Sequence, residues 1–320
     1  MKTQFKTIIV GLFLILFFVG CKSEKTENDL TKANLKGKVK STKETPYKAV
    51  EKFGEVTKGN VYINKFYFSD DNLDIISSIK HIVYNEIGNE TENRDYDSNG
   101  NTLKRRTFNY DEKGKRISQS VYNPKGLEYK ESYKYDEKGN QIEWSWYNSD
   151  GKLKSKYPCK YDEKGNLIEQ SRYNSYGELK WKHTYKYDEK GNEIEESRYD
   201  SDGELDLKYT SKYDEKGNKI EESKYNPDGE LVSKTTSKYD KKGNKIEWSI
   251  YNSDGELVSK HTYEYDEKGN LTAEYNESLL FGTHSKSYLY KYDKKNNWIE
   301  KIWFEDNIPK QITERKIVYY

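Results

Sequence analysis

Apolar or aromatic residues alternate with polar ones along most of the chain, in short stretches that each end at a turn containing glycine. Alternation with a period of two is typical of β-strands that bury one face. Two turn signals recur between the stretches, Tyr-Asp-Glu-Lys-Gly-Asn and Tyr-Asn-Ser-Asp-Gly, each with close variants. The pattern therefore predicts an all-β chain of strands joined by tight turns.

The two signals repeat with a spacing of about 26 residues. The first starts at Tyr110, Tyr135, Tyr161, Tyr187, Tyr213, Tyr239, Tyr265 and Tyr292, with a degenerate copy at Tyr84. The second follows 12 residues later, at Tyr96, Tyr122, Tyr147, Tyr173, Tyr199, Tyr225 and Tyr251. Each unit thus holds two turns and two strands.

The turn residues indicate hairpins. In Asn226-Pro227-Asp228-Gly229, Asn, Pro and Asp suit a type I turn, and Gly supplies the left-handed residue of a G1 bulge. Hairpins at both turns predict an antiparallel meander. A parallel β-helix with one repeat per coil is the alternative, but a hairpin at every corner would fold such a coil back on itself.

About twenty strands at roughly 4.8 Å each would make a sheet about 95 Å wide, which cannot stay flat. We expect a coiled single sheet, a β-solenoid, with the motif tyrosines on its inner face. The loop length places a row of glutamates on this tyrosine face, where they would accept hydrogen bonds from tyrosine hydroxyls: Glu143, Glu169, Glu195, Glu221 and Glu247. Residues 69–320 form the array, and residues 35–68 read as an N-terminal capping hairpin.

The same register leaves several large apolar residues on the opposite, charged face. They occupy slots that hold charged or polar residues in neighbouring units, so we take them as a candidate binding surface: Trp144, Trp146, Trp248, Ile250 and Trp303. Packing against a neighbouring coil or the capping hairpin is the alternative. Trp181 and Trp298 fall on the tyrosine face and are expected to be core.

The N-terminal residues resemble a targeting signal. Lys2 and Lys6 precede an apolar run, residues 8–19, that is short for a transmembrane helix but typical of a signal peptide. Gly20-Cys21 followed by a polar stretch resembles the lipobox of bacterial lipoproteins. The resemblance implies a signal peptide at 1–20, lipidation of Cys21 and a flexible tether over 21–34. Lys22 in place of Asp favours location in the outer membrane, and the sequence leaves open which leaflet the protein faces. An ordinary secretory signal or an uncleaved anchor are the alternatives.

The Tyr-Asp-x-x-Gly-Asn units over residues 67–320 resemble YD repeats, also called RHS repeats, of secreted toxins and cell-surface proteins. That resemblance implies a long coiled β-sheet. The lipobox and the closing Asn-Trp-Ile-Glu-Lys segment resemble uncharacterised repeat lipoproteins of the Gram-negative envelope. No toxin cargo or self-cleavage motif is expected here.

The amino-acid composition limits the kinds of partner and site that the chain can have. Charged residues make up 35% of the chain and the AVILMFWYC set 32%, but 31 tyrosines argue against disorder. A net charge of +1 gives no support for nucleic-acid binding. Two cysteines exclude a disulfide framework, Cys159 reads as a buried filler, and no cofactor or metal motif is present. The register pairs His183 with Glu169 and His261 with Glu247, which we interpret as structural.

These observations favour a non-enzymatic, lipid-anchored cell-envelope protein whose repeats form a scaffold that binds a protein or a glycan. An immunity role, in which the protein binds a toxin of a competing cell, is the alternative. Hydrolysis would require a pocket and a pair of groups with perturbed pKa values.

Overall fold

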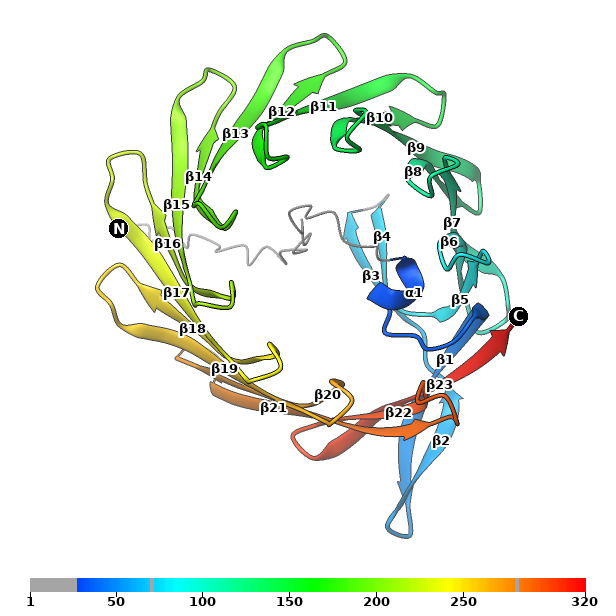
Figure 1. The fold of residues 1–320 in the computed structure, drawn as a ribbon. Coiled ribbons are helices and arrows are strands. Elements are labelled where there is room, and N and C mark those ends of the chain that lie inside the picture. The colour runs from blue at the N-terminus through cyan, green and yellow to red at the C-terminus, as the bar shows by residue number, and fades with distance from the viewer. Residues whose placement is uncertain (1–27, 70–71, 280–281) are drawn as a thin grey trace, which may run out of the picture.

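The computed structural model describes residues 28–69, 72–279 and 282–320, which form one large antiparallel sheet, a separate two-stranded sheet and a short helix. Figure 1 shows the sheet as a ring, viewed along its axis. The elements are α1 (Asp29–Lys32), β1 (Val39–Lys52), β2 (Glu55–Val61), β3 (Asn64–Ser69), β4 (Asn72–Ser77), β5 (Ile79–Tyr84), β6 (Glu90–Tyr96), β7 (Thr102–Tyr110), β8 (Arg116–Asn123), β9 (Gly126–Tyr135), β10 (Gln141–Asn148), β11 (Leu153–Tyr161), β12 (Leu167–Asn174), β13 (Leu179–Tyr187), β14 (Glu193–Tyr199), β15 (Leu205–Tyr213), β16 (Lys219–Tyr225), β17 (Leu231–Tyr239), β18 (Lys245–Asn252), β19 (Leu257–Tyr265), β20 (Leu271–Ser278), β21 (Gly282–Tyr292), β22 (Trp298–Glu305) and β23 (Ile308–Tyr319).

Strand β1 closes the ring. Each strand from β5 to β23 pairs with the next, and β1 pairs with both β23 and β5; Thr42, for example, faces Ile317 on one side and Ile82 on the other. Of the 21 strands in this sheet, β2 pairs only with β1, so 20 described strands make the closed barrel. The predicted coiled sheet or β-solenoid is therefore wrong, because two strands far apart in sequence meet and remove both sheet edges.

The hairpin turns are confirmed. Gly229 has φ +83°, its N–H donates to the Asn226 carbonyl at 3.1 Å, and the Asn226 N–H donates to Glu230 O at 3.0 Å. The other motif loop is also held by its first residue: both the N–H and the Nδ2 of Asn192 donate to the Asp188 carboxylate, at 2.8 Å. Side-chain bonds of this kind replace backbone partners that a tight turn cannot supply.

Four tyrosines of the first motif tie consecutive repeats together. Their hydroxyls donate to a backbone carbonyl 20 residues earlier, at the start of the strand that follows the preceding loop: Tyr161 to Gln141, Tyr187 to Leu167, Tyr213 to Glu193 and Tyr239 to Lys219, at 2.7–2.9 Å. The acceptors are thus backbone carbonyls, and the predicted row of glutamates does not accept these hydrogen bonds.

A β-bulge in each hairpin explains that error. Tyr147 faces Leu153 as the loop length predicts, but Trp146 then faces Ser155, because Lys154 is an extra residue on its strand. A shift of one residue moves every following side chain to the other face of the sheet. The same happens at the second loop, where Tyr161 faces Leu167 but Lys160 faces Glu169.

The displaced glutamates lie on the outer wall and pair with lysines. A ladder of ion pairs at 2.7–2.9 Å runs around the barrel: Lys134–Glu143, Lys160–Glu169, Lys186–Glu195, Lys212–Glu221, Lys238–Glu247 and Lys291–Glu300. These lysines are 66–71% exposed. The outer wall is thus charged and hydrated at regular intervals.

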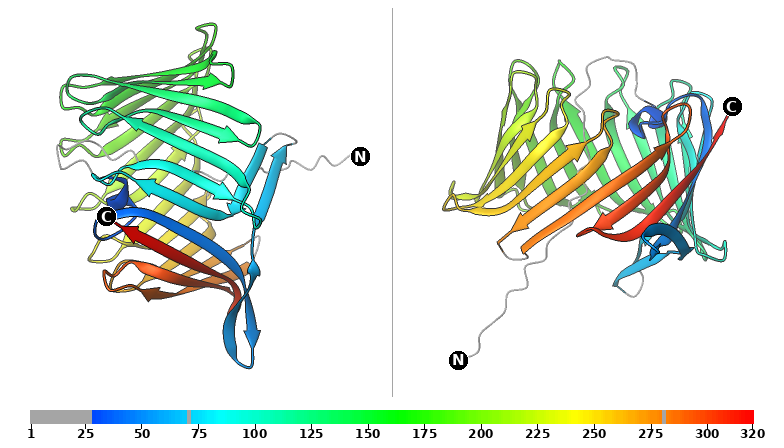
Figure 2. Two further views of the ribbon diagram at one scale, coloured as in Figure 1. Left: turned by 90° about the vertical axis from the view of Figure 1, so that its right-hand side faces the viewer. Right: turned by 90° about the horizontal axis from the view of Figure 1, so that it is seen from below.

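Helix α1 lies inside the ring in the axial view and near one end of the barrel (Figures 1 and 2). Leu30 is buried with Leu35, Val39 and Tyr84 in a small apolar cluster beside the β1–β5 seam. Asp29 accepts from the Tyr110 hydroxyl at 3.1 Å and pairs with Arg116 at 3.5 Å. The side chains of Tyr110 and Arg116 thus mark the inner face of the wall.

The predicted signal peptide, lipidated Cys21 and residues 21–27 of the tether lie outside the described residues. No helix among the described residues combines the length and apolar character needed to cross a membrane.

Candidate binding site on the inner wall

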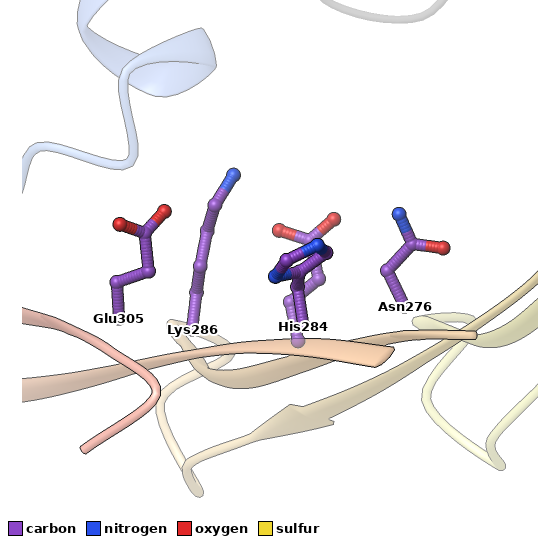
Figure 3. A pocket seen from close by; sticks show the side chains of 5 residues that line it. Asn276, His284, Lys286 and Glu305 are labelled. Atoms are coloured by element: carbon purple, nitrogen blue, oxygen red, sulfur yellow. The ribbon is translucent and has the colours of Figure 1, made fainter. Parts of the chain in front are cut away.

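A shallow hollow of about 280 Å³ shows which face of the sheet is the inner one on a second part of the barrel wall, away from Tyr110 and Arg116. It is lined by Glu274, Asn276, His284, Lys286 and Glu305, from β20, β21 and β22. In Figure 3 these side chains rise from the sheet toward α1, that is, into the barrel. The lining is polar and of mixed charge.

All six tryptophans of the chain lie on this inner face. Alternate residues of a strand share a face, and so do cross-strand partners. Cross-strand partners and alternate residues of a strand can therefore be followed around the barrel from the hollow, and all of them lie on the inner face. The successive sets of cross-strand partners are Asn276–His261–Trp248, Ile250–Thr235–Glu222–Ser211, Tyr209–Glu196–Tyr185, Arg198–His183–Gln170–Cys159, Arg172–Trp181 and Tyr157–Trp144. Trp303 faces Tyr288 beside the hollow, and Trp298 faces Tyr292.

The predicted binding residues Trp144, Trp146, Trp248, Ile250 and Trp303 thus share one face, as their equivalent positions in the repeat indicate, but that face is the interior of a barrel. Trp181 and Trp298, predicted as core on the opposite face, lie with them because of the bulges. The overlooked signal is charge complementarity: only the bulged register sets Lys160 opposite Glu169.

The interior is not filled by side chains. All six tryptophans are only partly buried. Twenty strands at about 4.8 Å give a circumference of about 96 Å and a diameter of about 30 Å before strand tilt widens it. Barrels of 16–18 strands leave an aqueous channel, so we expect the partly exposed tryptophan rings to meet water in the lumen, with the indole nitrogens of Trp144 and Trp303 buried.

The densest aromatic group spans β9 to β13. Trp144 stacks on Tyr157 with ring centroids 4.0 Å apart, and Trp181 lies 5.9 Å from Tyr157. Trp146 lies 6.1 Å from Tyr129 in a tilted contact. We call these five residues the aromatic strip. A second group, Trp248 with His261 at 5.0 Å, lies further around the wall.

Charged groups beside the strip are mostly paired. Glu196 accepts from Arg198 at 2.8 Å and lies 3.2 Å from His183 Nδ1. Burial raises the pKa of Glu196, but the hydrogen bonds from His183 and Arg198 outweigh it and lower the pKa to about 2. Glu193 on the same strand has no close ion pair among the described residues, and burial raises its pKa. On β14, therefore, the carboxylate with ion-pair partners ionises more readily than the one without.

The histidines differ from their predicted pairing. His183 and His261 face Gln170 and Trp248, with their carboxylate neighbours on the next strand, Glu196 and Glu274. Ser259 Oγ lies 3.3 Å from His261 Nε2, which suggests a nucleophile beside a base. However, the Ser259 hydroxyl donates to Asn276 Oδ1, and Glu274 is 3.7 Å from His261 Nδ1, beyond hydrogen-bond reach.

This set therefore lacks the two hydrogen bonds that activate a serine nucleophile. No group of three or more metal-binding side chains occurs within the described residues. Cys159 is buried and reduced, with Gln170 Nε2 at 3.7 Å from its sulfur, and burial raises its thiol pKa.

No family model matches the sequence, and no curated protein matches it. Among solved structures, a porin-like protein from Bacteroides uniformis matches 88% of this chain and 96% of its own, at 11% identity and TM-score 0.36. A porin-like protein from Bacteroides vulgatus matches 63% and 93%, at 12% identity and TM-score 0.29. The Tc holotoxin pore of Photorhabdus luminescens matches 81% of this chain but 19% of its own, at 12% identity and TM-score 0.22.

Likenesses this weak carry no argument about activity. The closed barrel corrects the expectation drawn from the sequence resemblance: the chain does not form the coiled sheet of YD/RHS-repeat proteins, although its repeats share the turn motif.

Proposed function

We propose that this protein is a non-enzymatic cell-envelope protein, lipid-anchored through Cys21, that binds a glycan inside its barrel. The observation that carries the proposal is the position of all six tryptophans on the inner wall. Aromatic rings stack on the apolar faces of sugar rings, and adjacent polar groups fix hydroxyls. A chain-like ligand can enter a lumen, whereas a folded protein would contact only the rims.

The anchoring part of the proposal rests on the lipobox-like segment before Cys21. The outer wall supports an anchored barrel over a bilayer-spanning one, because exposed lysines and glutamates occupy it at each repeat where a spanning barrel needs an apolar band. Cys21→Ser should move the protein from the membrane fraction to the aqueous fraction. Retention in the membrane fraction would contradict the anchor.

Glycan capture is tested with the double variant Trp146→Ala/Trp181→Ala on an array of bacterial and plant polysaccharides. We expect the wild type to retain at least one polysaccharide and the double variant to lose it. Tyr176→Ser is the control, because Tyr176 is 87% exposed in a turn outside the lumen. Equal capture by the double variant would place the site away from the aromatic strip.

A further inference from the structure

Arg172 differs from every other arginine of the chain. The other six each pair with a carboxylate: Arg94 and Arg105 with Glu92, Arg106 with Asp95, Arg116 with Asp29, Arg198 with Glu196 and Arg315 with Glu44, at 2.7–3.5 Å. Arg172 makes no ion pair within the part of the chain that the structure describes. A guanidinium has five donors and stays charged, so an unpaired one on a half-buried wall is unusual.

A comparison with the next repeat shows why Arg172 lacks a carboxylate partner. Arg198 is held by Glu196, two residues earlier on the same face. At the equivalent position before Arg172 the chain has Gln170, which is neutral and contacts the Cys159 sulfur. The bonds that Arg172 makes are long ones to a single hydroxyl, Ser155 Oγ, at 3.3 and 3.4 Å. Most of its donor capacity is therefore unused.

Arg172 also sits within the aromatic strip. Its guanidinium lies 5.8 Å from the Tyr157 ring centroid, and Trp181 is its cross-strand partner. A cation with free, forked donors next to aromatic rings suits a ligand that has a carboxylate attached to a sugar ring, because the fork matches a carboxylate in two parallel hydrogen bonds.

We propose that the inner wall selects an acidic saccharide, with Arg172 binding the carboxylate and the aromatic strip binding the ring. This inference rests on the proposed glycan-binding function and specifies its ligand class. Uronic acids and sialic acids share this chemistry.

The test compares matched probes by isothermal titration calorimetry. Tetragalacturonate and 3′-sialyllactose are each paired with their fully methyl-esterified forms, so each pair differs in the carboxylate charge. We expect the wild type to bind one acidic probe about tenfold or more tightly than its neutral partner. The acidic probe that binds identifies the source.

Two variants assign the selectivity to Arg172. Arg172→Gln removes the charge, whereas Gln170→Glu leaves the arginine in place and supplies the intramolecular partner that Arg198 has. Both should reduce affinity for the acidic probe to that for the neutral one. The control Arg105→Gln removes the same charge from the outer wall and should keep the selectivity.

Equal binding of acidic and neutral probes by the wild type, or unchanged selectivity in both variants, would overturn the role of Arg172 and leave glycan binding standing. Failure of the wild type to bind any of the four probes, together with no capture on the polysaccharide array, would overturn both proposals.

Discussion

Trp144 and Tyr157 stack with ring centroids 4.0 Å apart and planes inclined by 17°, although they come from successive strands and only the bulge at Lys154 brings them to one face. Offset aromatic pairs contribute about 1 kcal/mol beyond the area they bury. We expect Trp144→Ala to lower the free energy of unfolding by about 2 kcal/mol, measured by urea denaturation.

The coupling between the two rings isolates the stack. A double-mutant cycle with Tyr157→Ala should give about 1 kcal/mol of coupling. The matched pair is Trp146 with Tyr129, whose tilted contact at 6.1 Å should give a smaller value. Additive effects of Trp144→Ala and Tyr157→Ala would show that the rings do not stabilise one another.

A shielded ion pair joins β1 and β23, the two strands that meet where the barrel closes. Arg315 of β23 donates to Glu44 of β1 at 2.7 and 2.9 Å, and the Arg315 side chain is only 12% exposed. Removing one partner leaves a charge without compensation, so Glu44→Gln should cost about 3 kcal/mol. The exposed outer pair Lys160–Glu169 provides the control, and Glu169→Gln should cost less than about 1 kcal/mol. Equal costs in thermal denaturation would contradict this difference.

Two glutamates of one strand should respond to pH with opposite signs. The pKa of Glu196 is lowered from 4.5 to about 2, so its ionised form stabilises the fold above pH 4.5, and this contribution is lost as the pH falls through about 2. Glu196→Gln should therefore cost about 3 kcal/mol at pH 7 and only a small fraction of that near pH 2.

Burial raises the pKa of Glu193 instead, so ionisation weakens the fold as the pH rises above 4.5 and through the raised pKa. Glu193→Gln should stabilise the protein at pH 7 and have no effect near pH 3. Denaturation curves between pH 2 and pH 8 measure both variants. The same sign for the two substitutions at pH 7 would contradict the assignment of their environments.

The tyrosine hydroxyls that link the repeats should contribute similarly and independently. Tyr213→Phe deletes the bond to the Glu193 carbonyl, 2.7 Å long, and should lower the free energy of unfolding by about 1 kcal/mol. Tyr161→Phe, two repeats away, should add to it without coupling. The control Tyr176→Phe alters an exposed turn residue and should have no effect. A loss confined to one of the two repeats would argue against a uniform ladder.

Local chemistry made the repeat and its turns predictable, because Asp188, Asn192 and Gly229 act within their own loops. The loop length alone did not predict which side chains face the lumen. The extra residue Lys154 turns the residues that follow it on its strand to the opposite face of the sheet. Matching the lysines to the glutamates along the sequence would have given the bulged register. Closure has no comparable local signal, because it depends on β1 meeting β23 at a separation of 271 residues between Glu44 and Arg315.

Each repeat supplies two strands, so the chain can gain or lose a repeat without changing the antiparallel match between β1 and β23. Every such event would alter the circumference by about 10 Å. Duplication or deletion of a single unit within the gene would therefore change the bore in discrete steps and leave the seam intact.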